Sequence, residues 1–206
     1  MSLLTNWGYT IEDDAMPDML TGEEFDEFTA GKYSGDARTS GNIRAASAAV
    51  RDYCGWHVYP EEACVLETSV FDKRVARVGH DLLIQLPARY VSAVESVTVG
   101  ETEYTDVAKQ PNGLIKVPGA AHCVSELTTV TVNYTAGLPD ALMNGIKELI
   151  AHRVTHALAS SNGVQSETAG GVSITYSANW TNSARSTDLA DGNKEMLAPY
   201  KVQGVF

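Results

Sequence analysis

The chain has 206 residues, of which 44% are hydrophobic and 20% are charged, and its formal net charge is -11 at pH 7. This length suits one compact domain, and the acid excess argues against tight binding of nucleic-acid phosphates, which requires clustered Lys and Arg. No segment approaches the roughly 20 apolar residues of a membrane span, and the three Cys lack the CxxC spacing of a zinc or redox site. We therefore expect a soluble protein in a reducing compartment, with no membrane contact.

Both ends of the chain are predicted to be extended arms. Residues 1–18 are polar and acidic, with Trp7 and Tyr9 as isolated aromatics, and residues 179–206 are polar apart from a short helix near residues 193–197. Arms of this composition become ordered against a neighbouring chain. Trimming the second arm is therefore expected to leave the fold intact.

A short acidic helix is predicted over residues 21–31, where Thr21 and Glu24 have the spacing of a capping box. A run that contains Gly and Ser, expected to be flexible, follows this helix. Nine of the acids and a single Lys lie in residues 1–36, so the acid excess belongs to this end of the chain. A solvated surface is one interpretation of this cluster, and the lining of a channel formed by several copies is the other. The candidate channel-facing acids are Asp13, Asp14, Glu23, Glu24, Asp26 and Glu27.

Two longer segments have the period of an amphipathic helix. Residues 41–55 end at Gly55 and present a narrow, Ala-rich apolar face. Residues 139–162 begin with Pro139 and Asp140, which suit a first helical turn, and end before Gly163. The apolar face of the first helix comprises Ile43, Ala46, Ala49, Val50, Tyr53 and Cys54, and that of the second comprises Leu142, Ile146, Leu149, Ile150, Val154, Ala157 and Leu158.

A block of short strands lies between these two helices, at residues 64–134. Its apolar runs alternate with turn residues at hairpin spacing: Val65–Phe71, Leu82–Leu86, Val91–Val99, Leu114–Val117 and Leu127–Tyr134. A further strand, Val172–Tyr176, follows a Gly pair and is expected to form a hairpin arm or a sheet edge. The sequence thus predicts an α+β fold in which residues 1–206 form one domain. Its amphipathic helical core has helices near 21–31, 41–55 and 139–162, with an inserted antiparallel β subdomain near 64–134.

One set of side chains has a spacing that metal sites use. Glu148, His152 and His156 follow one another at four-residue steps on one flank of the long helix, but the pattern is not HExxH and no Cys partner accompanies it. No nucleophile motif or phosphate loop is present either. We therefore assign no catalytic residue, no cofactor and no metal, and expect a protein that is not an enzyme. A small metal-dependent enzyme or ligand-binding β module is kept as an alternative.

The order of these segments resembles that of the head-to-tail connector, or adaptor, proteins of long-tailed double-stranded DNA phages and prophages. The resemblance spans nearly the whole chain, and the present chain has a larger β insertion than the compact, nearly all-helical members. It is carried by six stretches: MLTGEEFDEFTAG, SGNIRAASAAVRDYCGWHVYP, LLIQLPARYVSAVESVTVGETEY, TVTVNYTAGLPDALMNGIKELIAHRVTHAL, GGVSITYS and MLAPYKV.

The resemblance implies a structural protein of the virion, located at the head–tail interface and in the host cytoplasm during assembly. Copies of it would form a ring below the portal, dodecameric when assembled, that joins head to tail and continues the DNA channel. The implied partners are the chain itself, the portal protein, a stopper or tail-completion protein, and double-stranded DNA that passes through without sequence-specific binding. By analogy residues 179–206 would lie against the portal. The candidate portal contacts are Trp180, Leu197, Tyr200 and Phe206.

A stopper, a tail-completion protein or a minor capsid-binding protein is the alternative within the same assembly. These proteins would engage other partners, and their copy number could differ.

Overall fold

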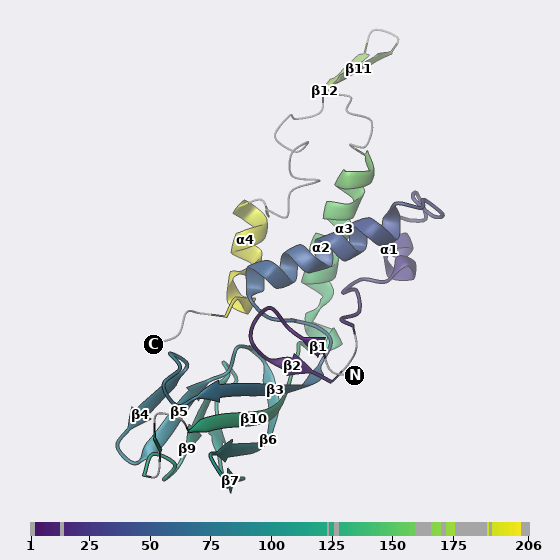
Figure 1. The fold of residues 1–206 in the computed structure, drawn as a ribbon. Coiled ribbons are helices and arrows are strands. Elements are labelled where there is room, and N and C mark those ends of the chain that lie inside the picture. Colours follow the sequence, from purple (N-terminus) through teal and green to yellow (C-terminus); the bar gives the residue numbers. More distant parts are fainter. Residues whose placement is uncertain are drawn as a thin grey trace. The chain divides into compact units, whose positions relative to one another are not determined.

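The computed structural model describes residues 3–12, 15–122, 124–125, 128–159, 166–169, 172–175, 189 and 191–202. The fold is α+β, as the sequence predicts, and the chain divides into two compact units (Figure 1). The first, here called the β unit, comprises Met1–Pro17, Cys54–Asp140 and Tyr200–Phe206. The second, here called the helical unit, comprises Asp18–Tyr53 and Ala141–Pro199.

The larger sheet of the β unit has six strands in the order β1-β2-β3-β10-β6-β7, and every neighbouring pair is antiparallel. At its centre Val132 lies opposite Leu66 on one side and Val97 on the other, and all three side chains are fully buried. The strands are β1 (Leu3–Leu4), β2 (Thr10–Ile11), β3 (Glu62–Ser69), β10 (Thr129–Ala136), β6 (Val91–Val99) and β7 (Thr102–Tyr104).

The smaller sheet has four antiparallel strands in the order β4-β5-β9-β8. Every second side chain along its two central strands is buried, as the sequence pattern predicts. Leu82 and Ile84 on β5, and Ile115 and Val117 on β9, are all fully buried. The buried faces of the two sheets supply the core of the β unit. The strands are β4 (Val75–Val78), β5 (Asp81–Gln85), β9 (Leu114–Val117) and β8 (Ala108–Lys109).

The N-terminal segment is part of the larger sheet and is not an arm over its described residues. Thr10 and Ile11 pair with Val65 and Cys64 of β3, and Ile11 is 2% exposed. Tyr9 is equally buried, and its hydroxyl oxygen lies 2.8 Å from Nδ1 of His57. The polar composition of this segment misled the sequence prediction, because only three of its described residues, Thr5, Tyr9 and Ile11, are buried.

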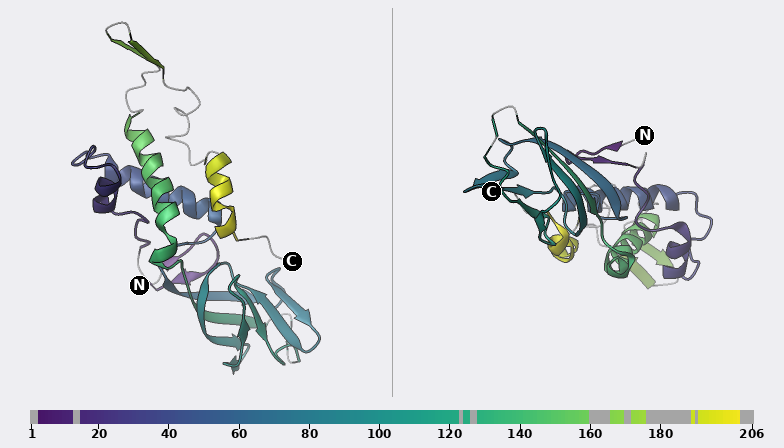
Figure 2. Two further views of the ribbon diagram at one scale, coloured as in Figure 1. Left: turned by 180° about the vertical axis from the view of Figure 1, so that it is seen from behind. Right: turned by 90° about the horizontal axis from the view of Figure 1, so that it is seen from below.

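The helical unit contains four α-helices among its described residues. They are α1 (Gly22–Phe28), α2 (Thr39–Cys54, whose last residue the division places in the β unit), α3 (Asn144–Ala159) and α4 (Asp191–Leu197). Views from opposite sides show α2 crossing α3 (Figures 1 and 2). The predicted apolar face of α2 is buried, with Ile43, Ala46 and Val50 each at most 2% exposed.

The long helix starts later than the sequence pattern predicts. Asp140–Leu142 form a turn of 3-10 helix, and α3 itself begins at Asn144. Leu142 therefore lies outside the apolar face of the helix and is 40% exposed, whereas the neighbouring Met143 is fully buried. The rest of the face is buried as predicted from Ile146 to Leu158, apart from the half-buried Ala157. The predicted end of this helix near residue 162 lies outside the described residues.

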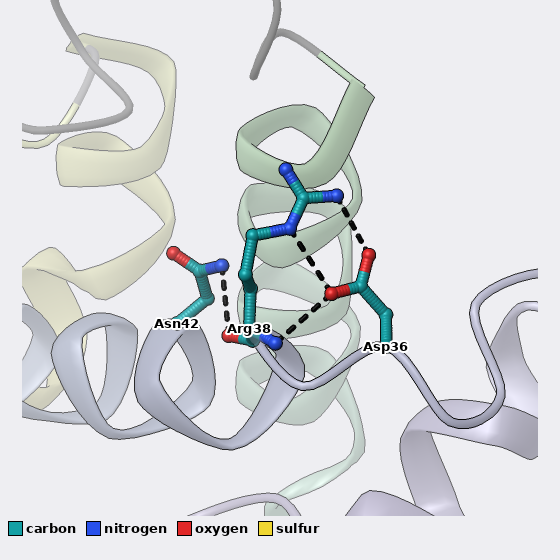
Figure 3. Close-up of polar contacts among 3 residues, drawn as sticks. All are labelled: Asp36, Arg38 and Asn42. Atoms are coloured by element: carbon teal, nitrogen blue, oxygen red, sulfur yellow. Dashed lines mark hydrogen bonds and ion pairs between the residues drawn. The ribbon is translucent and has the colours of Figure 1, made fainter.

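The run before α2 is held by hydrogen bonds, although its composition suggested flexibility. The carboxylate of Asp36 accepts three hydrogen bonds from Arg38, one from the backbone and two from the guanidinium (Figure 3). The amide of Asn42 donates to the carbonyl of Arg38 at 3.0 Å. These contacts, chiefly the guanidinium hydrogen bond, lower the pKa of Asp36 to about 2. They fix the turn that leads into α2.

A separate two-stranded hairpin follows α3 in the sequence. Strand β11 (Ser166–Ala169) pairs with β12 (Val172–Thr175) in antiparallel register, so the predicted hairpin arm is confirmed. The last predicted helix is confirmed as α4 and is followed by a 3-10 turn, Ala198–Tyr200. None of the helices formed by the described residues is both long enough and apolar enough to cross a membrane.

Candidate functional site

The acids proposed to face a channel lie on α1 where the structure describes them. Glu23 and Glu27 are exposed, whereas Glu24 and Asp26 are half-buried. Asp13 and Asp14 lie outside the described residues. The helix has acids in its first turn and no basic residue in its last turn. Glu23 and Glu27 are thus the described acids most available to a charged partner.

Glu24 makes two sets of hydrogen bonds within the helical unit, and the sequence predicts only the first of them. The capping box is confirmed: the backbone N–H of Glu24 donates to Oγ1 of Thr21 at 3.1 Å, and Oε2 of Glu24 accepts from the Thr21 backbone at 2.8 Å. Its other oxygen accepts from Nζ of Lys147 on α3 at 2.6 Å. Because both oxygens are used within the unit, Glu24 joins two helices and is poorly suited to line a channel. No local signal in the sequence marks this pair.

The predicted portal-contacting residues have different surroundings. The Leu197 side chain is fully buried, and Tyr200 is half-buried. Leu197 therefore belongs to the core and cannot be a portal contact without unfolding of α4, which corrects that assignment. Trp180 and Phe206 lie outside the described residues.

The segment after α4 is bonded into the β unit, and it is not an extended arm over its described residues. Nε1 of the buried Trp56 donates to the carbonyl of Tyr200 at 2.8 Å, and the backbone N–H of Val202 donates to the carbonyl of Cys54 at 2.9 Å. Arg89 donates to the carbonyl of Lys201 at 3.1 Å. The expectation that this end can be trimmed without loss of fold stays a prediction, and these hydrogen bonds argue against it for residues 200–202.

The acid and imidazoles considered as metal ligands do not converge on one point. Nε2 of His152 lies 3.8 Å from a carboxylate oxygen of Glu148, and both side chains are largely exposed. Within the described ranges, no group of three or more His, Cys, Asp and Glu side chains could hold a metal ion. The arrangement therefore has the features of a solvent-facing helix flank.

A groove that the sequence did not predict runs beside α1 and α3 within the helical unit. Its volume is about 300 Å³, and we call it the α1–α3 groove. Phe28, Lys32 and Tyr33 line one side, and Glu148, His152 and Thr155 line the other. Phe28 is 51% exposed, so its ring is available to a partner. The groove thus combines aromatic surface with one Lys and one Glu.

Comparisons with known proteins show no family for this chain. No protein-family profile matches the sequence, and no curated protein matches it. A solved structure described as the neck of an empty GTA particle, computed with C6 symmetry, is similar with a TM-score of 0.46 and 15% sequence identity. That likeness covers 96% of the present chain and 97% of the other.

Proposed function

We propose that this protein is a head-to-tail adaptor of a phage or phage-like particle. In this role, copies form a ring below the portal, dodecameric when assembled, that joins head to tail and continues the DNA channel. The protein is a structural part of the virion and not an enzyme, and it assembles in the host cytoplasm before it occupies the head–tail interface. Its other partners are the portal protein and a stopper or tail-completion protein.

The order of the elements along the chain is the observation that carries this proposal. An acidic helix, an Ala-rich helix, a β block, a long helix entered through Tyr134–Pro139, a hairpin and a last short helix follow one another in the order of the adaptor family that the sequence resembles. The two compact units support it further, since a ring subunit needs two different surfaces that meet their complements on neighbouring copies.

The acidic balance of the chain suits a channel through which DNA moves. Phosphates bind tightly where clustered Lys and Arg release counterions, and an acidic surface does not do so. If Glu23 and Glu27 face the channel, they repel phosphates that come within a Debye length of about 8 Å at physiological salt. Double-stranded DNA would then pass without sequence-specific binding and without being held.

The test measures the mass of the purified protein by light scattering, first alone and then mixed with rings of the portal protein encoded in the same genome. Negative-stain imaging of the mixture shows where any added density lies. The proposal predicts a ring, or a monomer that joins one end of the portal ring. Portal rings of an unrelated phage are the matched control, and they should gain no mass.

Two other results would replace the proposal. A protein that ignores bare portal rings but binds portal rings already carrying another adaptor would be a stopper or tail-completion protein. A monomer indifferent to both that binds zinc stoichiometrically would be an enzyme or a ligand-binding module built around Glu148, His152 and His156.

A further inference from the structure

An exposed aromatic side chain stands on a rigid turn of the β unit. Phe71 is 61% exposed and lies between β3 and β4. The turn is closed by backbone hydrogen bonds from Asp72 to Ser69 at 2.9 Å and from Val75 to Asp72 at 2.9 Å, and the backbone N–H of Phe71 donates to the Ser69 hydroxyl at 3.2 Å. These bonds hold the backbone that presents Phe71, so little conformational freedom would be lost if a partner buried the ring.

A cation accompanies this ring. The guanidinium carbon of Arg77 lies 5.3 Å from the centroid of the Phe71 ring, a distance at which the cation and the ring attract each other. Aromatic and Arg side chains are enriched among the few residues that contribute most to the free energy of protein association. Phe71 and Arg77 therefore form a pre-arranged pair, here called the aromatic knob, that projects from the β unit.

The α1–α3 groove of the helical unit has complementary features. It is walled by Phe28 and Tyr33, and the Tyr33 ring is itself supported by Phe25 at a centroid distance of 6.2 Å. Its volume of about 300 Å³ is large enough for one aromatic side chain, and Glu148 supplies a carboxylate at its side. Burial of an exposed Phe favours association, and the opposite charges of Arg77 and Glu148 would fix the orientation of the ring.

We propose that the aromatic knob of one copy seats in the α1–α3 groove of the next copy, with Arg77 facing Glu148. The knob and the groove are different surfaces of one chain, so this contact is head-to-tail and leaves a free knob and a free groove at its two ends. Repetition of such a contact adds further copies and, where the rotation closes, produces a ring. The inference rests on the proposed ring function and names the two surfaces through which neighbouring copies meet.

The first experiment is a charge exchange in the full-length protein, with self-association measured by sedimentation velocity alone and on portal rings. Arg77→Glu and Glu148→Arg should each weaken association about 30-fold, which is the size of an interface hot spot, and Phe71→Ser should do the same. The double variant, in which both charges are reversed, should recover most of the loss. Arg44→Glu, on the exposed face of α2, is the matched control and should associate like the parent chain.

The second experiment places a photoreactive benzoylphenylalanine at residue 71. Equal amounts of isotopically light and heavy chains are mixed before irradiation, so that a cross-link between copies is distinguished from one within a copy. Mass spectrometry should find the label joined to peptides of another copy that contain residues 28–33 or 148–155.

The possible results separate this inference from the proposed function. Rings that form, alone or on the portal, with the residue 71 label attached elsewhere on a neighbour or on the portal protein, would overturn the knob-and-groove contact and leave the adaptor proposal standing. Rings unaffected by Arg77→Glu and Glu148→Arg would do the same. A chain that never associates with itself or with the portal would overturn both.

Discussion

The hydroxyl oxygen of Tyr9 lies 2.8 Å from Nδ1 of His57 and also accepts the backbone N–H of His57 at 3.0 Å. On the other side of the imidazole, Nε2 is 2.8 Å from the carbonyl oxygen of Ala136. A carbonyl only accepts, so Nε2 carries a proton, and in the neutral ring Nδ1 is the acceptor for the Tyr9 hydroxyl. The buried imidazole thereby ties the segment before β2 to the end of β10.

Tyr9→Phe should lower the free energy of unfolding by about 1–3 kcal/mol, because it leaves Nδ1 and the backbone N–H of His57 buried without this partner. Urea denaturation near neutral pH measures the change. Tyr90→Phe is the control, since the Tyr90 side chain is 44% exposed. Equal losses in the two variants would contradict the role assigned to the Tyr9 hydroxyl.

Glu24 should make stability depend on pH. Burial opposes ionisation of this carboxyl, but hydrogen bonds with Lys147 and with Thr21 outweigh it and lower the pKa of Glu24 below 4.5. Because the folded-state pKa lies below the unfolded one, the stabilisation is complete above about pH 4.5 and is lost as the pH falls through the folded pKa.

The expected result is that the parent chain loses stability more steeply than Glu24→Gln when urea midpoints are compared from about pH 5 down to about pH 3. Glu27→Gln, on the exposed face of the same helix, should keep the slope of the parent. A parent-like slope in Glu24→Gln would show that the pair with Lys147 contributes nothing to acid sensitivity.

Gly137 should not tolerate a side chain. A Cβ at this position would lie 2.3 Å from Cα of Glu61, and the backbone φ is +152°. Gly137→Ala should therefore cost about 3 kcal/mol or more, through both the clash and the strained backbone.

Gly119 separates these two causes, since its φ is +71° but a Cβ there would meet nothing within 4 Å. Gly119→Ala should cost only the backbone strain of about 1–2 kcal/mol. Thermal unfolding of the two variants gives the comparison. Similar losses would mean that the close approach of Glu61 to Gly137 relaxes readily.

The thiols of Cys54 and Cys64 should be inert in the folded protein. Both are buried, and burial raises the pKa of each to about 12, so the reactive thiolate is scarce. In a Cys123→Ser chain, a chromogenic disulfide reagent at about pH 8 should react slowly before denaturation and with two thiols after it. Rapid labelling of either thiol in the folded chain would contradict the burial of these residues.

A chain that ends at Pro199 should be less stable than one that ends at Val202. The shorter chain loses the three hydrogen bonds that residues 200–202 make to Trp56, Arg89 and Cys54. At about 1 kcal/mol for each bond, the free energy of unfolding should fall by about 2–4 kcal/mol. Equal denaturant midpoints for the two chains would restore the interpretation of this segment as a dispensable arm.

The elements that the sequence predicts correctly are those long enough to show a period. The apolar face of α2 and the alternation of β3, β6 and β10 are visible over many residues, and burial selects the same positions. Strands β1, β2 and β8 have two residues each, which is too short for any period. Their pairing depends on partners elsewhere in the chain, and nothing local encodes it.

The candidate site was harder to predict for the same physical reason. The capping box of α1 is local, and it was found. Lys147 meets Glu24 only because α3 packs beside α1, and the α1–α3 groove exists only when both helices are in place. For Leu197 the sequence predicted a contact with a partner that the structure does not support. An apolar residue in a polar tail has the composition of a partner contact, but Leu197 is covered by its own chain.

The β unit is assembled from three separate stretches of chain, so it can complete its folding only late in translation. Tyr9 leaves the ribosome well before His57, and Cys54 leaves it long before Val202. At about 5–20 residues per second, roughly 10–40 s of translation separate Tyr9 from Val202. Until then the indole of Trp56 lacks its final partner, the carbonyl of Tyr200. The nascent β unit is thus most exposed to wrong pairing during translation, and its last bonds form only when nearly the whole chain has emerged.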